Sequence, residues 1–183
     1  MRPFLSSIFL VILISTSFSQ EKPFPHNIRY PYGFLSSNIK SENQETWYKN
    51  YKKYLKPCNG GLLPSTDDAN TAKVEAQGWA MITAAYMGDK ETFDGLYKYY
   101  QSKCTNQAGG MMAWRTNCGG FLDQGSATDG DLDVAYSLVV AHWQWPNEGY
   151  LDKAKKVINN CKKLIVNCGG ISALAGGHSG SLY

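Results

Sequence analysis

The chain has 183 residues, of which 43% are hydrophobic and 18% are charged, and its formal net charge is +3. This length allows one domain with a core of its own. The basic residues are scattered, apart from two short clusters (KNYKK and KAKK) at helical spacing. This pattern is typical of solvated helix faces and argues against a nucleic-acid-binding surface.

The first nineteen residues have the pattern of a secretory signal peptide. Arg2 supplies the positive charge, residues 4–14 form a short apolar run, and Ser17-Phe18-Ser19 has the small-x-small form of a cleavage site. A membrane anchor is the alternative, but the run is too short to span a bilayer and no second candidate follows. We therefore expect a secreted protein whose mature domain spans residues 20–183, with no membrane association after cleavage.

Helical periodicity dominates the rest of the chain, and alternating strand-like runs are scarce. The predicted helices are of two types, one amphipathic and rich in lysine, the other apolar nearly all round. Residues 44–55, 91–102 and 151–164 form the first type, and residues 71–87 and 131–145 the second. Because an apolar helix must be covered on several sides, whereas an amphipathic one faces water, we expect alternating inner and outer helices.

A cysteine recurs at the end of each outer helix, and a Gly-Gly loop follows it. The three cysteines are Cys58, Cys104 and Cys161, at spacings suited to a repeat of helical hairpins. Glycines that simply cap helices are the alternative, which explains the glycines but not the register of the cysteines. The sequence therefore predicts an all-α repeat.

Glu75 is the only charge after Lys73 in the apolar helix at residues 71–87. Burial there disfavours a charged carboxylate, which suits a general acid. Trp79, four residues on, lies on the same face of the helix. The alternative is a structural glutamate in the first helical turn, where it favours the helix dipole.

Three aspartates, Asp129, Asp131 and Asp133, stand at alternate positions at the start of the second apolar helix. The free N–H groups and the dipole of the helix would stabilise an ionised Asp129. In such a helix Asp129 and Asp133 share a face, while Asp131 points elsewhere. An ionised aspartate facing a protonated glutamate is the arrangement that glycoside hydrolysis needs. Helix capping is the alternative reading, and we expect it to account for at least one of the three.

The segment GGMMAWRTNCGG lies between the two acidic motifs and carries Trp114 and Arg115. An indole can stack on a sugar ring, and a guanidinium can bind hydroxyl groups. The alternative is a tryptophan of the core.

Together these segments resemble glycoside hydrolase family 8, the cellulase D family. AKVEAQGWAMITAAYMGD is similar to the acid-bearing helix of the family, and MMAWRT to its substrate-stacking segment. ATDGDLDVAYSLVVAHWQW is similar to the family signature A-[ST]-D-[AG]-D-x-x-[IM]-A-x-[SA], with Val134 in place of Ile or Met. Val74 and Ala76 replace the usual Ser and Gly beside the acid of the first motif.

The resemblance implies a barrel of six inner and six outer helices, an (α/α)6 barrel, and an inverting, endo-acting hydrolase of β-1,4-linked polysaccharide. An endoglucanase is favoured over a chitosanase or xylanase, and no cofactor or metal is predicted. Glu75 would be the proton donor and Asp129 the second active-site carboxylate. Trp114 and Tyr136 would contact sugar, and the other candidate substrate-binding residues are Trp79, Arg115, Asp131 and Asp133.

The chain supplies three inner–outer helix pairs at most, about half of such a barrel, and it has no acidic residue after Asp152. We therefore expect a truncated form or one that relies on a partner, and the sequence leaves open whether the chain is active by itself. Two other functions stay open. One is a non-catalytic oligosaccharide-binding protein that keeps the stacking aromatics, and the other is a helical scaffold whose acids only cap helices.

The five cysteines are candidate disulfide partners in a secreted chain, and their odd number leaves at least one unpaired or paired between chains. Cys104 and Cys118 bracket the Trp114 segment. A bridge between them would close a loop of about fifteen residues and stabilise the fold by roughly 3 kcal/mol. Cys161 and Cys168 could pair in the same way.

Overall fold

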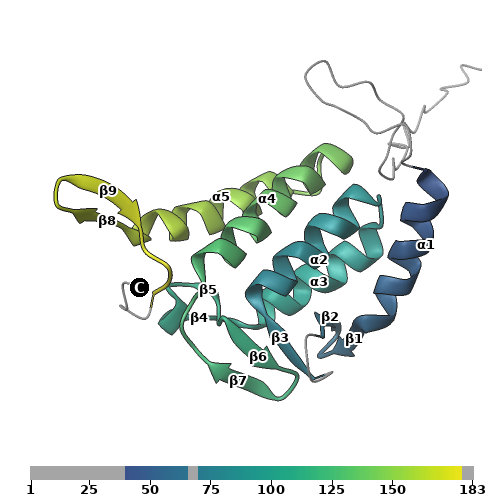
Figure 1. The fold of residues 1–183 in the computed structure, drawn as a ribbon, viewed down its shortest axis with the longest axis horizontal. Helices are drawn as coiled ribbons and strands as arrows, with labels where there is room; N and C mark the ends of the chain where they lie inside the picture. The colour runs from purple at the N-terminus through teal and green to yellow at the C-terminus, as the bar shows by residue number, and fades with distance from the viewer. Residues whose placement is uncertain (1–39, 66–69, 179–183) are drawn as a thin grey trace, which may run out of the picture.

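The structure, a computed structural model, describes residues 40–65 and 70–178 (Figure 1). The predicted signal peptide lies outside the described residues. The helices are Ser41–Tyr51 (α1), Val74–Tyr86 (α2), Lys90–Ser102 (α3), Thr128–Gln144 (α4) and Tyr150–Cys161 (α5). Short 3-10 turns, Lys52–Tyr54 (η1) and Lys162–Leu164 (η3), extend α1 and α5, and a third, Asn106–Ala108 (η2), lies in a loop. Each predicted helix is therefore confirmed, with its start displaced by three residues or fewer.

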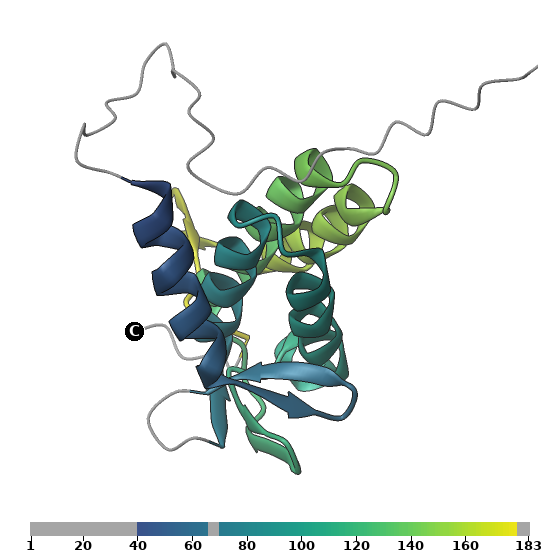
Figure 2. The same ribbon diagram turned by 90° about the vertical axis from the view of Figure 1, so that its right-hand side faces the viewer.

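The two apolar helices, α2 and α4, pack along each other, and the amphipathic helices α3 and α5 cover them. α3 packs against α2, and α5 packs against α4 (Figures 1 and 2). The core between them is rich in aromatic side chains, including Phe93, Tyr99 and Tyr150, which are at most 1% exposed. No helix in the described part of the chain is both long and apolar enough to span a membrane.

Short antiparallel strands connect the helices, and the sequence did not predict them. Three pairs of strands form hairpins: Leu55–Cys58 (β1) with Gly61–Pro64 (β2), Cys104–Thr105 (β4) with Met111–Met112 (β5), and Ile165–Cys168 (β8) with Ile171–Leu174 (β9). The other three strands, Thr71–Lys73 (β3), Arg115–Asn117 (β6) and Gly120–Asp123 (β7), form a sheet in the order β3-β6-β7. Strands of two to four residues are too short to show alternation of apolar and polar residues. The Gly-rich segments that were expected to be loops are the turns of these hairpins.

The α1–η1–β1–β2 and α5–η3–β8–β9 units have the same order of elements and the same register. Cys58 pairs with Gly61 across the first hairpin, and Cys168 pairs with Ile171 across the other. The turn residues between the strands have positive φ in both hairpins, at Asn59–Gly60 and at Gly169–Gly170. The chain therefore does repeat, but the equivalent of Cys58 is Cys168 rather than Cys161.

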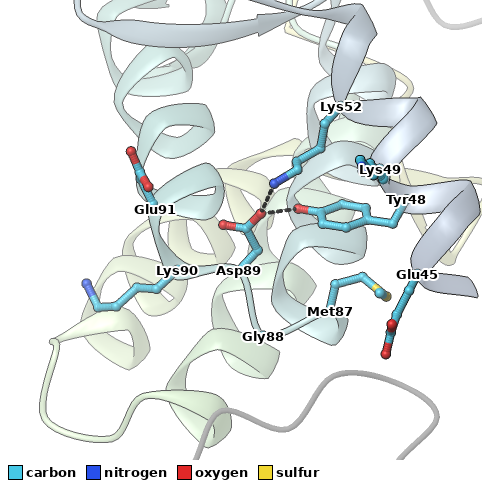
Figure 3. Close-up of a pocket in the computed structure, with 9 residues that line it drawn as sticks. All are labelled: Glu45, Tyr48, Lys49, Lys52, Met87, Gly88, Asp89, Lys90 and Glu91. Carbon is cyan, nitrogen blue, oxygen red and sulfur yellow. Dashed lines mark hydrogen bonds and ion pairs between the residues drawn. The ribbon is translucent and has the colours of Figure 1, made fainter. Parts of the chain in front are cut away.

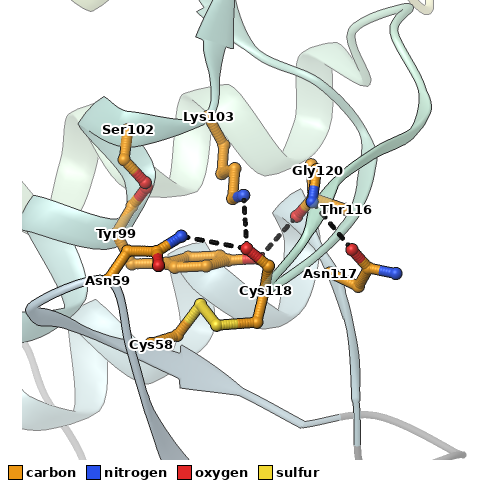
Figure 4. Close-up of a disulfide and its surroundings, with 9 residues drawn as sticks. All are labelled: Cys58, Asn59, Tyr99, Ser102, Lys103, Thr116, Asn117, Cys118 and Gly120. Carbon is orange, nitrogen blue, oxygen red and sulfur yellow. Dashed lines mark hydrogen bonds between the residues drawn. A yellow bond between two sulfur atoms is a disulfide. The ribbon is translucent and has the colours of Figure 1, made fainter.

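A disulfide joins the β1–β2 turn to the β6–β7 turn, through Cys58 and Cys118 with their Cα atoms 5.5 Å apart (Figure 4). The Cys118 carbonyl accepts hydrogen bonds from the Asn59 amide at 2.9 Å and from the Lys103 ammonium at 3.3 Å. The predicted Cys104–Cys118 bridge is therefore wrong, because the two hairpin turns meet and take Cys118.

The predicted Cys161–Cys168 bridge is also wrong. Cys161 is buried at the end of α5, where its thiol contacts the Met111 sulfur at 3.5 Å. Cys168 is exposed at the far end of β8, so the strand carries it away from Cys161. Cys104, Cys161 and Cys168 are free thiols.

Candidate active site

Glu75 and Asp129 lie in the first turns of α2 and α4, two helices that run side by side in the same direction. The direction follows from two close contacts. A Cβ atom on Gly130 would lie 2.7 Å from the Glu75 backbone nitrogen, and one on Gly78 would lie 3.2 Å from the Val134 nitrogen. The structure thus brings the two predicted catalytic acids to the same end of the helix pair.

Glu75 is partly buried, and one oxygen of its carboxyl group, Oε2, has no hydrogen-bond partner within the described residues. The connection between β5 and β6 fixes the start of this helix, because the Val74 amide donates to the Trp114 carbonyl at 3.0 Å. The Glu75 side chain is therefore held at the point where α2 meets the predicted sugar-stacking segment.

Asp129 is exposed in the first turn of α4, where the helix dipole favours negative charge. The N-cap residue is Ala127, and α4 has no side-chain capping hydrogen bond. The expectation that at least one of the three aspartates caps this helix is therefore wrong. The start of α4 is instead held by Thr128, whose amide donates to the Gly176 carbonyl at 2.9 Å and whose hydroxyl donates to the Ala175 carbonyl at 2.7 Å.

Polar contacts between side chains bridge the exposed face of α2 and α4. The Trp79 indole donates to the Asp133 carboxylate at 2.8 Å while 65% of the residue stays exposed. The hydroxyl groups of Tyr86 and Tyr136 are 2.5 Å apart, and Tyr136 is 50% exposed. Two aromatic rings are thus oriented by hydrogen bonds and open to solvent on the same helix pair as the acids, which is the chemistry that a sugar-stacking surface requires.

Trp114 and Arg115 lie beside the start of α2. Trp114 is partly buried against the core, and its amide donates to the Gly125 carbonyl at 2.7 Å. Arg115 is exposed and lies opposite Lys73 and Asp123 in the three-stranded sheet. Trp114 therefore packs against the core and contacts the start of α2 through its carbonyl.

Asp131 departs from the predicted site. It points away from Asp129, as expected, but it is fully buried and so does not offer a surface to substrate. Its Oδ1 atom accepts a hydrogen bond from the Tyr100 hydroxyl at 2.9 Å. Burial raises its pKa to about 7, against the opposing effect of the Tyr100 hydrogen bond. The alternation of the three acids predicted its direction, but nothing in the sequence marked Tyr100, on another helix, as its partner.

A separate hollow of about 670 Å³ lies between α1 and the turn from α2 to α3 (Figure 3). Its lining includes Asp89, which accepts hydrogen bonds from Tyr48 at 3.0 Å and Lys52 at 2.9 Å and caps α3 through the Thr92 amide. The hollow opens at the C-terminal end of α2, about 18 Å along the helix from Glu75. These contacts stabilise the packing of α1, and the hollow is not part of the acidic site.

No group of three or more His, Cys, Asp or Glu side chains in residues 40–65 and 70–178 could hold a metal ion. The sequence profile described as glycosyl hydrolases family 8 matches residues 23–181, which include both acids and all the aromatics of the site.

The chain belongs to glycosyl hydrolases family 8. This family has the (α/α)6-barrel fold, and the helix-rich architecture described above agrees with it. The resemblance inferred from the three sequence motifs is thereby confirmed.

Family 8 relatives include Endoglucanase 2 of Ruminiclostridium josui, 34% identical over 177 residues, a match covering 85% of this chain and 38% of the relative. Beta-glucanase of Niallia circulans is 36% identical over 169 residues, covering 82% of this chain and 41% of the relative. The chain thus spans well under half the length of the family 8 relatives that it matches.

The chain also covers less than half of each solved structure that it resembles. The β-1,3-1,4-glucanase from Paenibacillus sp. X4 has a TM-score of 0.73 and 29% identity, with 86% of this chain and 46% of that chain covered. Endoglucanase Cel10 from Klebsiella pneumoniae has a TM-score of 0.65 and 27% identity, with 74% and 44% covered.

Proposed function

We propose that this family 8 protein hydrolyses β-linked glucan in an endo-acting, inverting manner. The observation that carries the proposal is the pairing of Glu75 and Asp129 at the same end of two parallel helices, α2 and α4, held together at Gly78 and Gly130. The names of the relatives, endoglucanase and beta-glucanase, support β-glucan as the substrate class.

In this proposal Glu75 donates a proton to the leaving glycosidic oxygen. A water molecule attacks the anomeric carbon from the opposite face, and a carboxylate takes the proton that the water loses. Asp129 is the second carboxylate of the site, exposed in the first turn of α4, where the helix dipole favours negative charge. Inverting chemistry places the two carboxyl groups about 6.5–9.5 Å apart, which leaves room for the water.

Substrate would lie along the exposed face of α2 and α4. Trp79, oriented by Asp133, and Tyr136, oriented by Tyr86, supply ring faces on which sugar units can stack. Arg115 and Trp114 would contact the sugar from the sheet side.

We further propose that the protein is secreted and that its helix pairs form part of an (α/α)6 barrel. The matched relatives are more than twice as long as the portion that this chain covers. The exposed Trp143 on the apolar helix α4 agrees with a surface that further helices would cover.

A non-catalytic oligosaccharide-binding role is the second candidate, favoured by the exposed aromatic residues Trp79 and Tyr136. One experiment distinguishes the two. Reducing-sugar release from lichenan, carboxymethyl cellulose, chitosan and xylan is measured with the full chain, and binding of cello-oligosaccharides is titrated in parallel. Hydrolysis of the β-glucans supports the hydrolase, binding without turnover supports the second candidate, and neither binding nor turnover contradicts both.

A further inference from the structure

Asp131 is a buried carboxyl group to which the proposed reaction assigns no direct role. None of its surface is exposed, and it accepts hydrogen bonds from the Tyr100 hydroxyl, at Oδ1, and from the Met112 backbone N–H. Its Oδ2 atom is buried as well and has no hydrogen-bond partner among the described residues. A carboxyl group that is buried with half of its acceptors unpaired destabilises the fold, so its position calls for an explanation.

The backbone links Asp131 directly to the acid pair. It follows Asp129 by two residues in the first turn of α4, and the intervening Gly130 lies against the Glu75 backbone. Tyr100 belongs to α3, which packs on α2. The hydrogen bond between Asp131 and Tyr100 therefore ties the start of α4 to α3 and holds Asp129 beside Glu75.

The titratable groups around Asp131 are acidic or weakly ionisable, apart from Lys156 of α5. The titratable groups that act on it or on its immediate neighbours are Glu75 of α2, Tyr100 of α3, Cys104 of β4, Cys161 and Lys156 of α5, and Asp129 of its own helix. No lysine or arginine in the part of the chain that the structure describes forms an ion pair with it.

The charge on Asp131 changes near neutral pH. Its pKa is raised to about 7, first of all by burial and to a smaller extent by the negative charges of Asp129 and Glu75. The Tyr100 hydroxyl and the Met112 backbone N–H oppose that rise. Ionisation of Asp131 thus adds a negative charge, weakly screened, next to both acids of the pair.

We propose that Asp131 is a positioning residue for the pair: anchored on Tyr100, it fixes the first turn of α4, and its own charge is electrostatically coupled to Glu75 and Asp129. The catalytic meaning of this coupling rests on the proposed function. The coupling itself is a property of the folded chain and can be measured without turnover.

The test follows the ¹³C carboxyl signals of Glu75 and Asp129 by NMR in the full chain, between about pH 4 and pH 9. Besides its own titration, each signal should show a second inflection near neutral pH, as Asp131 ionises. Asp131→Asn should abolish that inflection. Asp152→Asn, which removes an exposed aspartate from the first turn of α5, should leave it in place. An inflection missing from the parent, or persisting in Asp131→Asn, overturns the proposal.

Tyr100→Phe provides a second test that keeps the carboxyl group and does not depend on Asp131→Asn folding. Because the hydroxyl group stabilises the charged form of Asp131, its removal should move the inflection to higher pH. An unmoved inflection would contradict the anchoring role of Tyr100.

Turnover gives a separate readout. If the full chain hydrolyses lichenan, Asp131→Asn should lower kcat and leave KM nearly unchanged, because a buried group does not contact substrate. A raised KM with unchanged kcat would overturn the positioning role. Absence of hydrolysis in the parent would count against the proposed function alone, since the NMR inflection does not need it.

Discussion

Gly130 of α4 lies directly against the backbone of Glu75 in α2, so that a Cβ atom at residue 130 would stand 2.7 Å from the Glu75 nitrogen. Gly78 makes the reciprocal contact, with its Cβ position 2.5 Å from the Cβ atom of Asp133. An added Cβ atom would meet the Glu75 backbone in one case and the Asp133 Cβ atom in the other. Neither atom can move without moving its helix. The two glycines thus set how closely the helices, and with them Glu75 and Asp129, approach.

Gly130→Ala should cost about 1–3 kcal/mol by overpacking, because the added methyl group forces the two helices apart. The helix propensity of alanine offsets about 1 kcal/mol of this cost, so we expect a net destabilisation of up to about 2 kcal/mol. Denaturant unfolding measures the change. Gly120→Ala is the matched control, since a Cβ atom there meets nothing within 4 Å. Equal stability of Gly130→Ala and Gly120→Ala would show that the close approach does not constrain the fold.

The Cys58–Cys118 disulfide should stabilise the fold by roughly 4 kcal/mol, because it closes a large loop of the unfolded chain, its two cysteines being 60 residues apart in sequence. The double variant Cys58→Ala/Cys118→Ala should unfold at correspondingly lower denaturant. Reductant should lower the stability of the parent and leave that of the double variant unchanged. If reductant has no effect on the parent, the bridge is absent or contributes nothing.

The three free thiols should differ in reactivity. Burial, with the charge of Asp131, raises the pKa of Cys104 to about 12 and that of Cys161 to about 11, so both stay protonated at pH 8. Cys168 is exposed. Brief alkylation of the native protein at pH 8, followed by peptide mapping, should therefore modify Cys168 first, and all three should react in denaturant. Labelling of Cys104 as fast as Cys168 would contradict the burial described here.

The helices could be predicted from the sequence because each is long enough to show its periodicity and its type. The hairpins could not, because β4 and β5 have two residues each and the longest strands have four. The disulfide depends on which two turns meet in space, so Cys118 could not be assigned to Cys58 from spacing. In the site, the motifs predicted Glu75 and Asp129, but the burial of Asp131 depends on α3, which lies outside every motif.

Trp79→Ala should weaken the binding of cello-oligosaccharides by about 1 kcal/mol, or roughly fivefold, because an exposed and oriented ring is lost. Isothermal titration calorimetry on the full chain measures the change. Trp143→Ala is the matched control, as Trp143 is 80% exposed and lies on α4 about 21 Å beyond Asp129. Equal losses in the two variants would show that the binding surface is not the one beside the acids.

The most direct test of the acid pair measures hydrolysis of lichenan by the Glu75→Gln variant. The variant is made in the same form of the protein in which the parent hydrolyses lichenan. Glutamine keeps the shape of the side chain and removes the proton that the leaving oxygen needs. We expect reducing-sugar release to fall by about 100-fold or more while oligosaccharide binding is retained, and Asp129→Asn to show a comparable loss. A Glu75→Gln protein that hydrolyses lichenan as fast as the parent would contradict the account.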